Sequence, residues 1–236
     1  MNNNTLDPVT DLQWLKEKHP EIFNEVIVGN EYQLSREHVE NKNVIDIGAN
    51  VGMFSIFAAY LGAKKIVAAE PASTTFNLLK ENVITSEFKN IEIYRNAVLN
   101  VTGAKISLPL QPESGHTSLF KPSDSYDSVD TITLNDMISL LPDGDIILKI
   151  DCEGSEYDIL LNTSIEDLKR VKTIHIEIHA DIHPIYKDFD VIENKIASLG
   201  FAKIRENRML GYIVNERGEI VNSVPLPVKI CCFERI

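Results

Sequence analysis

Cysteine is scarce in this sequence and forms none of the usual frameworks. The 236 residues contain three cysteines, of which Cys231 and Cys232 are adjacent and Cys152 stands alone. Adjacent residues of a strand face opposite sides, so the pair is not expected to form a disulfide, and no CxxC spacing offers a structural zinc site. The disulfide-rich secreted class is therefore excluded, and we expect a cytoplasmic protein.

Export and membrane signals are also missing. The first residues, Met1 to Pro8, have neither a basic start nor an apolar stretch. The most apolar segment, Val51 to Ala63, is shorter than the about 20 residues that a membrane-spanning helix needs. We therefore expect a chain that is not inserted in a membrane.

Basic residues are outnumbered and form no long run. The sequence has 23 lysine and arginine residues against 35 aspartate and glutamate residues, a formal net charge of −12. Proteins that bind a nucleic-acid backbone collect lysine and arginine on one face, so we expect no nucleic-acid partner. The 44% of hydrophobic residues is ample for the core of one α/β domain.

The segment Asn43 to Gly52 organises the rest of the chain. Its apolar first half indicates a strand over 44–47 that is buried on both faces, and the apolar residues of 53–61 recur at helical spacing. Gly48 lets the intervening turn take dihedrals that a side chain forbids, and Gly52 lets the helix start close to the sheet. A strand, a glycine turn and a helix in this order are typical of a nucleotide site.

The glycine turn lacks two glycines of the dinucleotide fingerprint. When G-x-G-x-x-G is aligned with its second glycine on Gly48, Asp46 and Val51 occupy the other two glycine positions. Asp46 would repel a pyrophosphate and favours a cation in the pocket, which argues against an NAD-dependent oxidoreductase, the first alternative. Glu70 follows the next strand about 20 residues after the turn, where a carboxylate accepts the hydroxyls of a ribose. A ribose, a positive charge and no phosphate describe S-adenosylmethionine.

Several segments of the chain together resemble FkbM-type methyltransferases, and they occur in that family's order. They are residues 44–52, 70–71, 115–119, 133–136 and 147–154, with 176–179 downstream. The resemblance implies S-adenosylmethionine as the cofactor. It also implies methyl transfer to the hydroxyl of a small molecule or a glycan.

The order of the apolar segments and this resemblance predict an α/β fold with a doubly wound, mostly parallel seven-stranded sheet, the Rossmann-like class I methyltransferase fold. Residues 1–41 are expected to form a helical extension that packs on the core, and 42–236 the methyltransferase domain. A β-rich insertion is expected between Gly103 and Thr133. The expected strands are 32–34, 44–47, 66–69, 91–94, 105–110, 117–120, 129–133, 145–151, 174–179, 201–205, 210–214 and 228–233, and the expected helices are 53–61, 73–84 with Ser73 as N-cap, 134–141, 157–161 and 190–199.

Two carboxylates follow the strand 145–151. In an open parallel sheet, ligands bind at the carboxyl ends of the strands where strand order reverses, so Asp151 and Glu153 should stand opposite the glycine turn. Close carboxylates repel one another, and a sulfonium, an ammonium or a metal would relieve this; the alternative is that both face water. Lys149, in the buried strand, is expected to pair with an acid. Backbone groups near Ala97 are expected to hold the adenine.

The strand 174–179 carries a rival signal for a metal. His175, Glu177 and His179 share one face, and His183 follows, a set able to chelate zinc or another divalent ion. His175 and His179 lie roughly 13 Å apart along a strand, and His175 falls at the end away from the pocket. A metal-dependent hydrolase would therefore use Glu177, His179 and His183, and we expect no tightly bound metal.

The expected mechanism is in-line attack of a hydroxyl on the sulfonium methyl, in which positioning is worth up to ~7–11 kcal/mol. A base for the hydroxyl proton adds about 10²–10⁴-fold. The candidates are His179, Glu153 and Asp151, in no order that the sequence decides, and His116 is a weaker one. The residues expected to bind the cofactor are Asp46, Gly48, Asn50, Gly52, Glu70, Ala97 and Asp151.

Two further observations concern the acceptor. Enzymes that methylate base amines carry an acid or asparagine, two prolines and an aromatic residue after this strand, and Asp151 is followed instead by Cys152 and Glu153. Base amines are therefore not the leading substrates. In the insertion, Ser118 either contacts a ligand or caps a turn. A protein that binds the cofactor without turnover is a third alternative.

Overall fold

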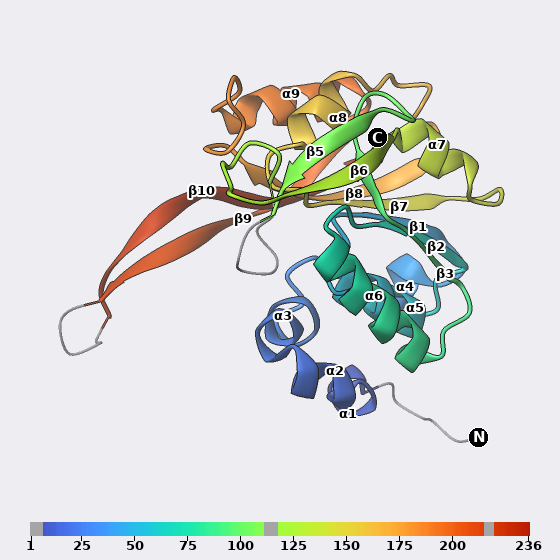
Figure 1. Cartoon of the computed structure of the whole chain (residues 1–236). Coiled ribbons are helices and arrows are strands. Elements are labelled where there is room, and N and C mark those ends of the chain that lie inside the picture. Colours follow the sequence, from blue (N-terminus) through green and yellow to red (C-terminus); the bar gives the residue numbers. More distant parts are fainter. Residues whose placement is uncertain (1–6, 111–117, 215–219) are drawn as a thin grey trace, which may run out of the picture.

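A seven-stranded sheet forms the centre of the molecule (Figure 1). The computed structural model describes residues 7–110, 118–214 and 220–236. The strand order is β3-β2-β1-β7-β8-β10-β9. The strands β3, β2, β1, β7 and β8 run parallel to one another, and β10 is antiparallel to both of its neighbours, β8 and β9. The predicted doubly wound, mostly parallel sheet is confirmed. Its strands are β1 Asn43–Ile47, β2 Lys65–Ala69, β3 Ile91–Tyr94, β7 Ile146–Ile150, β8 Val171–His179, β9 Phe201–Val214 and β10 Ile220–Arg235.

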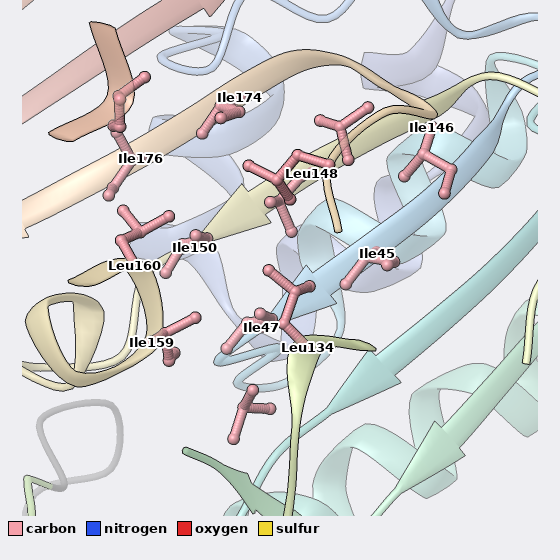
Figure 2. Close-up of a cluster of buried hydrophobic side chains, with 14 of the residues drawn as sticks. Ile45, Ile47, Leu134, Ile146, Leu148, Ile150, Ile159, Leu160, Ile174 and Ile176 are labelled. Atoms are coloured by element: carbon pink, nitrogen blue, oxygen red, sulfur yellow. The ribbon is translucent and has the colours of Figure 1, made fainter. Parts of the chain in front are cut away.

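Helices cover both faces of this sheet (Figure 1). One face carries α5 Met53–Tyr60 and α6 Ser73–Ser86, and the other carries α7 Leu134–Ser139, α8 Glu156–Leu161 and α9 Phe189–Ser198. Under the second group, Ile45, Leu148 and Ile174 of three adjacent strands pack with the helices (Figure 2). Burial on both faces explains why these strands are continuous apolar runs. No helix in the described part of the chain is long and apolar enough to cross a membrane.

The N-terminal extension is helical and packs against α5. Pro20 begins the second of two short helices that His19 separates, because proline is tolerated in the first turn, where its missing N–H leaves no bond unmade. Leu15 and Phe23 are fully buried in one cluster with Phe54 and Phe57. The predicted extended stretch at 32–34 is a turn followed by irregular chain. The elements are α1 Pro8–Asp11, α2 Gln13–Lys18, α3 Pro20–Phe23, the π-helical turn η1 Asn24–Val28 and α4 Arg36–Val39.

The predicted β-rich insertion is present as a second, three-stranded sheet. Its strands are β4 Asn96–Val98, β5 Lys105–Pro109 and β6 Tyr126–Ile132, in the order β4-β6-β5. The prediction of a strand over 117–120 is wrong for the described residues 118–120, which form a turn, and Thr117 lies outside the described residues. This sheet places Ala97 of β4 beside the carboxyl end of the main sheet.

Ser73 is not the N-cap of α6 as predicted. Ala72 holds that position, and two acids from outside the helix take over the capping role. Glu70 Oε1 accepts the N–H of Ala72 at 3.0 Å, and Asp127 Oδ2 accepts the N–H of Ser73 at 3.1 Å. The start of α6 is therefore tied both to the end of β2 and to the insertion.

The antiparallel edge consists of two long strands instead of three short ones. The predicted segments 201–205 and 210–214 are parts of one strand, β9, because its pairing with β10 continues between them with a shift in register. This hairpin extends away from the body of the protein (Figure 1). Cys231 and Cys232 in β10 are buried free thiols, as expected.

Candidate active site

The glycine turn lies directly against the end of β7. Gly48 has a φ of +72°, and a Cβ there would stand 1.7 Å from the carbonyl oxygen of Asp151. Gly52 has a φ of +89°, and its Cβ would stand 2.6 Å from Leu79 Cδ1 of α6. Both glycines are required because the turn must approach two neighbouring elements closely.

Asp46 lies beneath the turn and is not among the described residues that line the cavities of this region. It is completely buried, Ser55 Oγ donates a hydrogen bond of 2.6 Å to Oδ2, and Lys149 Nζ lies 3.3 Å from Oδ1. The expectation that Asp46 faces the cofactor and makes the pocket prefer a cation is therefore corrected. The ammonium of Lys149 balances the charge of Asp46, and Asp46 supports the glycine turn from inside the protein.

Lys149 is the centre of this support. Its Nζ donates a hydrogen bond of 2.6 Å to the carbonyl of Gly48 and lies 3.5 Å from Asp151 Oδ2. Burial alone would lower the pKa of the ammonium, but the carboxylates of Asp46 and Asp151 raise it above its usual value, so Lys149 stays charged. The prediction that Lys149 pairs with an acid is confirmed.

Three adjoining cavities follow the carboxyl ends of the strands. The first is mostly apolar and lined by Ala97, Val98, Leu108 and Leu119 among others, and the second is lined by Gly48, Asn50, Glu70 and Thr75 among others. The third is the largest, about 540 Å³. The first and second share Gly48, Pro71 and Cys152, and the second and third share Asn50, Asp151 and Glu153. A long ligand can therefore run through all three.

Glu70 and Asn50 form the middle of this row. Glu70 Oε2 accepts the N–H of Asn50 at 3.0 Å, and burial raises the pKa of the Glu70 carboxyl to about 7 although this bond and the one from Ala72 lower it. Asn50 Oδ1 is a buried acceptor without a hydrogen-bond partner in the described structure. An acid with free lone pairs and an orphaned acceptor suit the hydroxyl and ammonium donors of S-adenosylmethionine.

The N-terminal extension forms one wall of the large cavity. Tyr32 Oη donates a hydrogen bond of 3.1 Å to Asp151 Oδ2, and Glu31 lines the cavity beside it. Burial, together with the charges of Glu177, Glu25 and Asp151, raises the pKa of the Glu31 carboxyl to about 8. The sequence offered no periodic signal for either residue, because both lie in irregular chain.

The three predicted catalytic residues meet at one end of the sheet. Asp151 and Glu153 line the cavities, and His179, at the end of β8, is buried behind them with Nε2 3.9 Å from Glu153 Oε1 and 3.5 Å from Glu177 Oε1. Burial opposes the charged form of His179, but the surrounding carboxylates, Glu156 first, raise its pKa well above its usual value.

Glu156 is the residue of this cluster that sequence reasoning missed. Its side chain is completely buried, its Oε1 lies 3.0 Å from His179 Nδ1, and its two oxygens accept the N–H groups of Cys152 and Gly154 at 2.9 Å. It therefore orients the imidazole and holds the loop that carries Glu153. The sequence signal that could have indicated this role is an acid at the start of a helix, Glu156, two residues after Gly154.

Of the three residues of the metal hydrolase alternative, Glu177 and His179 meet at 3.5 Å, and His183 does not join them. His183 Nδ1 accepts the N–H groups of Ile185 and Tyr186, so the ring is occupied in holding its own turn. His175 lies apart from the three cavities, as expected, and burial lowers its pKa to about 4. Ser118 Oγ donates to the carbonyl of Glu153 at 2.6 Å, which favours the structural alternative for that residue. His116 lies outside the described residues.

The sequence is similar to a known family and to several named proteins. Residues 46–203 match the methyltransferase FkbM domain. The chain is 31% identical over 120 residues to a Methanocaldococcus jannaschii protein provisionally named a protein N5-glutamine methyltransferase, and the match covers 50% of this chain and 60% of that protein. It is 34% identical over 73 residues to the rRNA N(6)-adenosine-methyltransferase Mettl5 of Drosophila melanogaster, with 31% and 34% covered. The chain thus spans less than two thirds of either relative.

Two solved structures are similar at low sequence identity. Precorrin-6y C5,15-methyltransferase of Geobacter metallireducens aligns at 15% identity with a TM-score of 0.48 over 88% of this chain and 85% of that one. A Streptococcus pneumoniae protein solved with S-adenosyl-L-methionine aligns at 12% identity with a TM-score of 0.49 over 87% and 72%. The assignment rests on the sequence match, which covers more than half of the chain. The chain belongs to the FkbM family of S-adenosylmethionine-dependent methyltransferases.

Proposed function

We propose that the protein methylates a hydroxyl group of a sugar or another small molecule. The observation that carries this proposal is the position of Asp151 and Glu153, which line both the cavity beside Glu70 and the large cavity. A small acceptor in the large cavity meets the donor site between these two carboxylates. The volume of about 540 Å³ suits a molecule of this size.

The row of cavities suggests how the chain holds its cofactor. The apolar cavity beside Ala97 takes the adenine, Glu70 accepts hydrogen bonds from the ribose, and the buried acceptor of Asn50 receives a polar donor of the methionine end. The cofactor supplies a methyl group on a positively charged sulfur. Gly48 and Gly52 contribute by letting the backbone come close, and Asp46 contributes through Lys149.

We assign removal of the acceptor proton to Glu153. Asp151 is already engaged by other groups, because Tyr32 donates a hydrogen bond of 3.1 Å to its Oδ2 and the buried ammonium of Lys149 lies 3.5 Å from the same oxygen. Glu153 is paired at 3.2 Å with Lys121, whose side chain is 38% exposed, so solvent screens that attraction more strongly. His179 does not line these cavities, and we assign it no transfer of the acceptor proton.

The named relatives suggest nitrogen acceptors, a glutamine amide and an rRNA adenine. The absence of paired prolines after Asp151 and the net charge of −12 favour a hydroxyl over a nucleic-acid base. The NAD-dependent alternative is disfavoured because Asp46 and Val51 replace fingerprint glycines. Methyl transfer to a glutamine-containing peptide is the outcome that would replace the hydroxyl proposal.

Calorimetry and a transfer assay together test the proposal. We expect S-adenosylmethionine to bind in titration calorimetry and NAD not to bind. Incubation with labelled cofactor and panels of hydroxylated sugars, glutamine-containing peptides and short RNAs should label a sugar, with NMR of the product showing a methyl ether. Glu153→Gln should lose about 10²–10⁴-fold in turnover with cofactor affinity retained. Labelling confined to peptide or RNA would refute the proposed acceptor class.

A further inference from the structure

One histidine and two carboxylates converge beside the large cavity. Asp151, Glu177 and His179 each offer one ligating atom, and the three atoms lie within 4.8 Å of one another. Asp151 and Glu177 line the cavity, and His179 is buried behind them. Ligands of an octahedral divalent cation at about 2.1 Å stand about 3–4 Å apart, so modest rotations of these side chains would complete a site.

The imidazole of His179 is oriented as in known metal sites. Glu156 is ionisable, completely buried and 3.0 Å from Nδ1, and the N–H groups of Cys152 and Gly154 fix its carboxylate in place. A carboxylate that accepts a hydrogen bond from one ring nitrogen fixes the direction of the ring, and a metal ion that displaces the proton of the other nitrogen then binds its lone pair. Here that other nitrogen, Nε2, lies 3.5 Å from Glu177 Oε1.

Negative charge exceeds positive charge around this point. Lys149 is shared between Asp46 and Asp151, and Lys121 is paired with Glu153. Glu177 lines the same cavity in addition, and burial followed by the charge of Glu177 raises the pKa of the neighbouring Glu31. Carboxylates this close repel one another unless a cation lies between them, so a bound cation would stabilise the arrangement.

We propose that Asp151, Glu177 and His179 Nε2 bind a divalent metal ion and that the acceptor hydroxyl completes its coordination, a role that rests on the proposed function. One imidazole with two carboxylates suits Mn²⁺ or another first-row ion better than Mg²⁺ or Ca²⁺, which prefer oxygen ligands. Such an ion would lower the pKa of the coordinated hydroxyl, whose proton would pass to Glu153 while its oxygen bonds to the methyl carbon, the bond from that carbon to sulfur breaks and S-adenosylhomocysteine leaves as a neutral thioether. The proposed site departs from the sequence-based expectation of no tightly bound metal, and Asp151 takes the place of His183 in the ligand set.

Titration of Mn²⁺ followed by electron paramagnetic resonance tests binding without cofactor or acceptor. We expect one ion per chain, and Glu177→Gln and His179→Gln should each weaken binding at least about tenfold. Glu156→Gln should weaken it by about 10–100-fold through the lost orientation of the ring. Glu193→Gln is the matched control. Glu193 belongs to a second cluster, with Glu206 and Cys231, whose carboxylates are already paired with Lys203 and Lys229, so binding should be unchanged.

Three outcomes would overturn the metal site: no binding of Mn²⁺ at millimolar concentration, full binding by both Glu177→Gln and His179→Gln, or equal loss in Glu193→Gln. Circular dichroism checks that each variant is folded. If Glu177→Gln does not fold, the Mn²⁺ affinity of His179→Gln decides whether the metal site exists. Binding of S-adenosylmethionine is measured separately by calorimetry. Cofactor binding and sugar methylation without Mn²⁺ binding would reject the metal and leave the proposed function standing. Mn²⁺ binding without sugar methylation would reject the proposed function and leave the metal site standing.

Discussion

Tyr32 Oη lies 3.1 Å from Asp151 Oδ2, and this hydrogen bond joins the N-terminal extension to the end of β7. The Tyr32 ring meets Phe54 edge-on with centroids 5.3 Å apart, and Lys149 Nζ lies 5.8 Å from its centroid. Burial, followed by the charge of Asp151, raises the pKa of the Tyr32 hydroxyl well above its usual value, so it stays a donor. Tyr32 therefore fixes Asp151 from the side of the large cavity.

Tyr32→Phe should remove this bond and keep the ring packing. We expect kcat to fall about tenfold, a loss of about 1.4 kcal/mol in transition-state stabilisation. Cofactor affinity should be unchanged, and the free energy of unfolding should fall by about 1–2 kcal/mol. Steady-state kinetics, calorimetry and urea unfolding measure the three quantities. An unchanged kcat would show that the bond has no role in turnover.

Lys149→Met should destabilise the protein by about 3–5 kcal/mol, because it leaves the completely buried Asp46 carboxylate without its partner. The double variant Asp46→Asn with Lys149→Met should recover much of that loss, since neither charge is then left alone. Urea unfolding of the wild type, both single variants and the double variant gives the coupling free energy. Additive losses would contradict the support role assigned to this pair.

The sheet was predictable because its signal is local. Val44, Ile45 and Ile47 are apolar on both faces of one short strand, and Gly48 and Gly52 mark where it ends. The antiparallel edge was predicted less well, because β9 has a register shift where the sequence suggested a break. The prediction of Ser73 as N-cap was wrong because the carboxylates of Glu70 and Asp127 accept the first N–H groups of α6.

The site was predictable only in part because its contacts join distant residues. Asp151 and Glu153 were expected at the strand end, and they line the cavities. The Lys149 contacts with the Gly48 turn and the bond from Tyr32 to Asp151 cross more than 100 residues of chain, which no periodicity encodes. Asp46 was assigned to the ligand because its buried partner could not be identified from spacing.

Gly48→Ala should destabilise the protein far more than Gly103→Ala, although both glycines have a positive φ. A Cβ at Gly48 would meet the Asp151 carbonyl at 1.7 Å, whereas a Cβ at Gly103 would have nothing within 4 Å. We expect a cost of about 1–2 kcal/mol at Gly103 from backbone strain alone. At Gly48 the clash adds to it, and both cofactor binding and thermal stability should be lost. Equal melting temperatures would contradict the close approach of the turn to β7.

Glu70 should make cofactor binding depend on pH. Its pKa of about 7 means that the carboxylate is mostly protonated at pH 6 and mostly ionised at pH 8. The ionised form accepts both ribose hydroxyls, so affinity for S-adenosylmethionine should rise by about tenfold across this window. Calorimetry at several pH values measures it. Glu70→Gln should bind more weakly at pH 8 and show a flatter profile, and parallel profiles would contradict the assignment.

The same group should lower stability as pH rises. A carboxyl whose pKa is higher in the folded than in the unfolded protein holds its proton only in the folded state between pH 4.5 and 7. The free energy of unfolding should therefore fall across that range, by up to about 3 kcal/mol. Denaturant titration of the wild type against Glu70→Gln isolates this contribution. A wild-type stability that rises relative to the variant would reverse the sign and refute it.

The wall that carries Glu31 and Tyr32 lies before residue 46, where the match to the FkbM domain begins. If the large cavity takes the acceptor, as proposed, one of its walls is encoded outside the stretch that matches the family, whereas Asp151 and Glu153 on the opposite side lie within it. Exchange of the leading segment between homologous enzymes should then change which acceptor is methylated while S-adenosylmethionine remains the methyl donor.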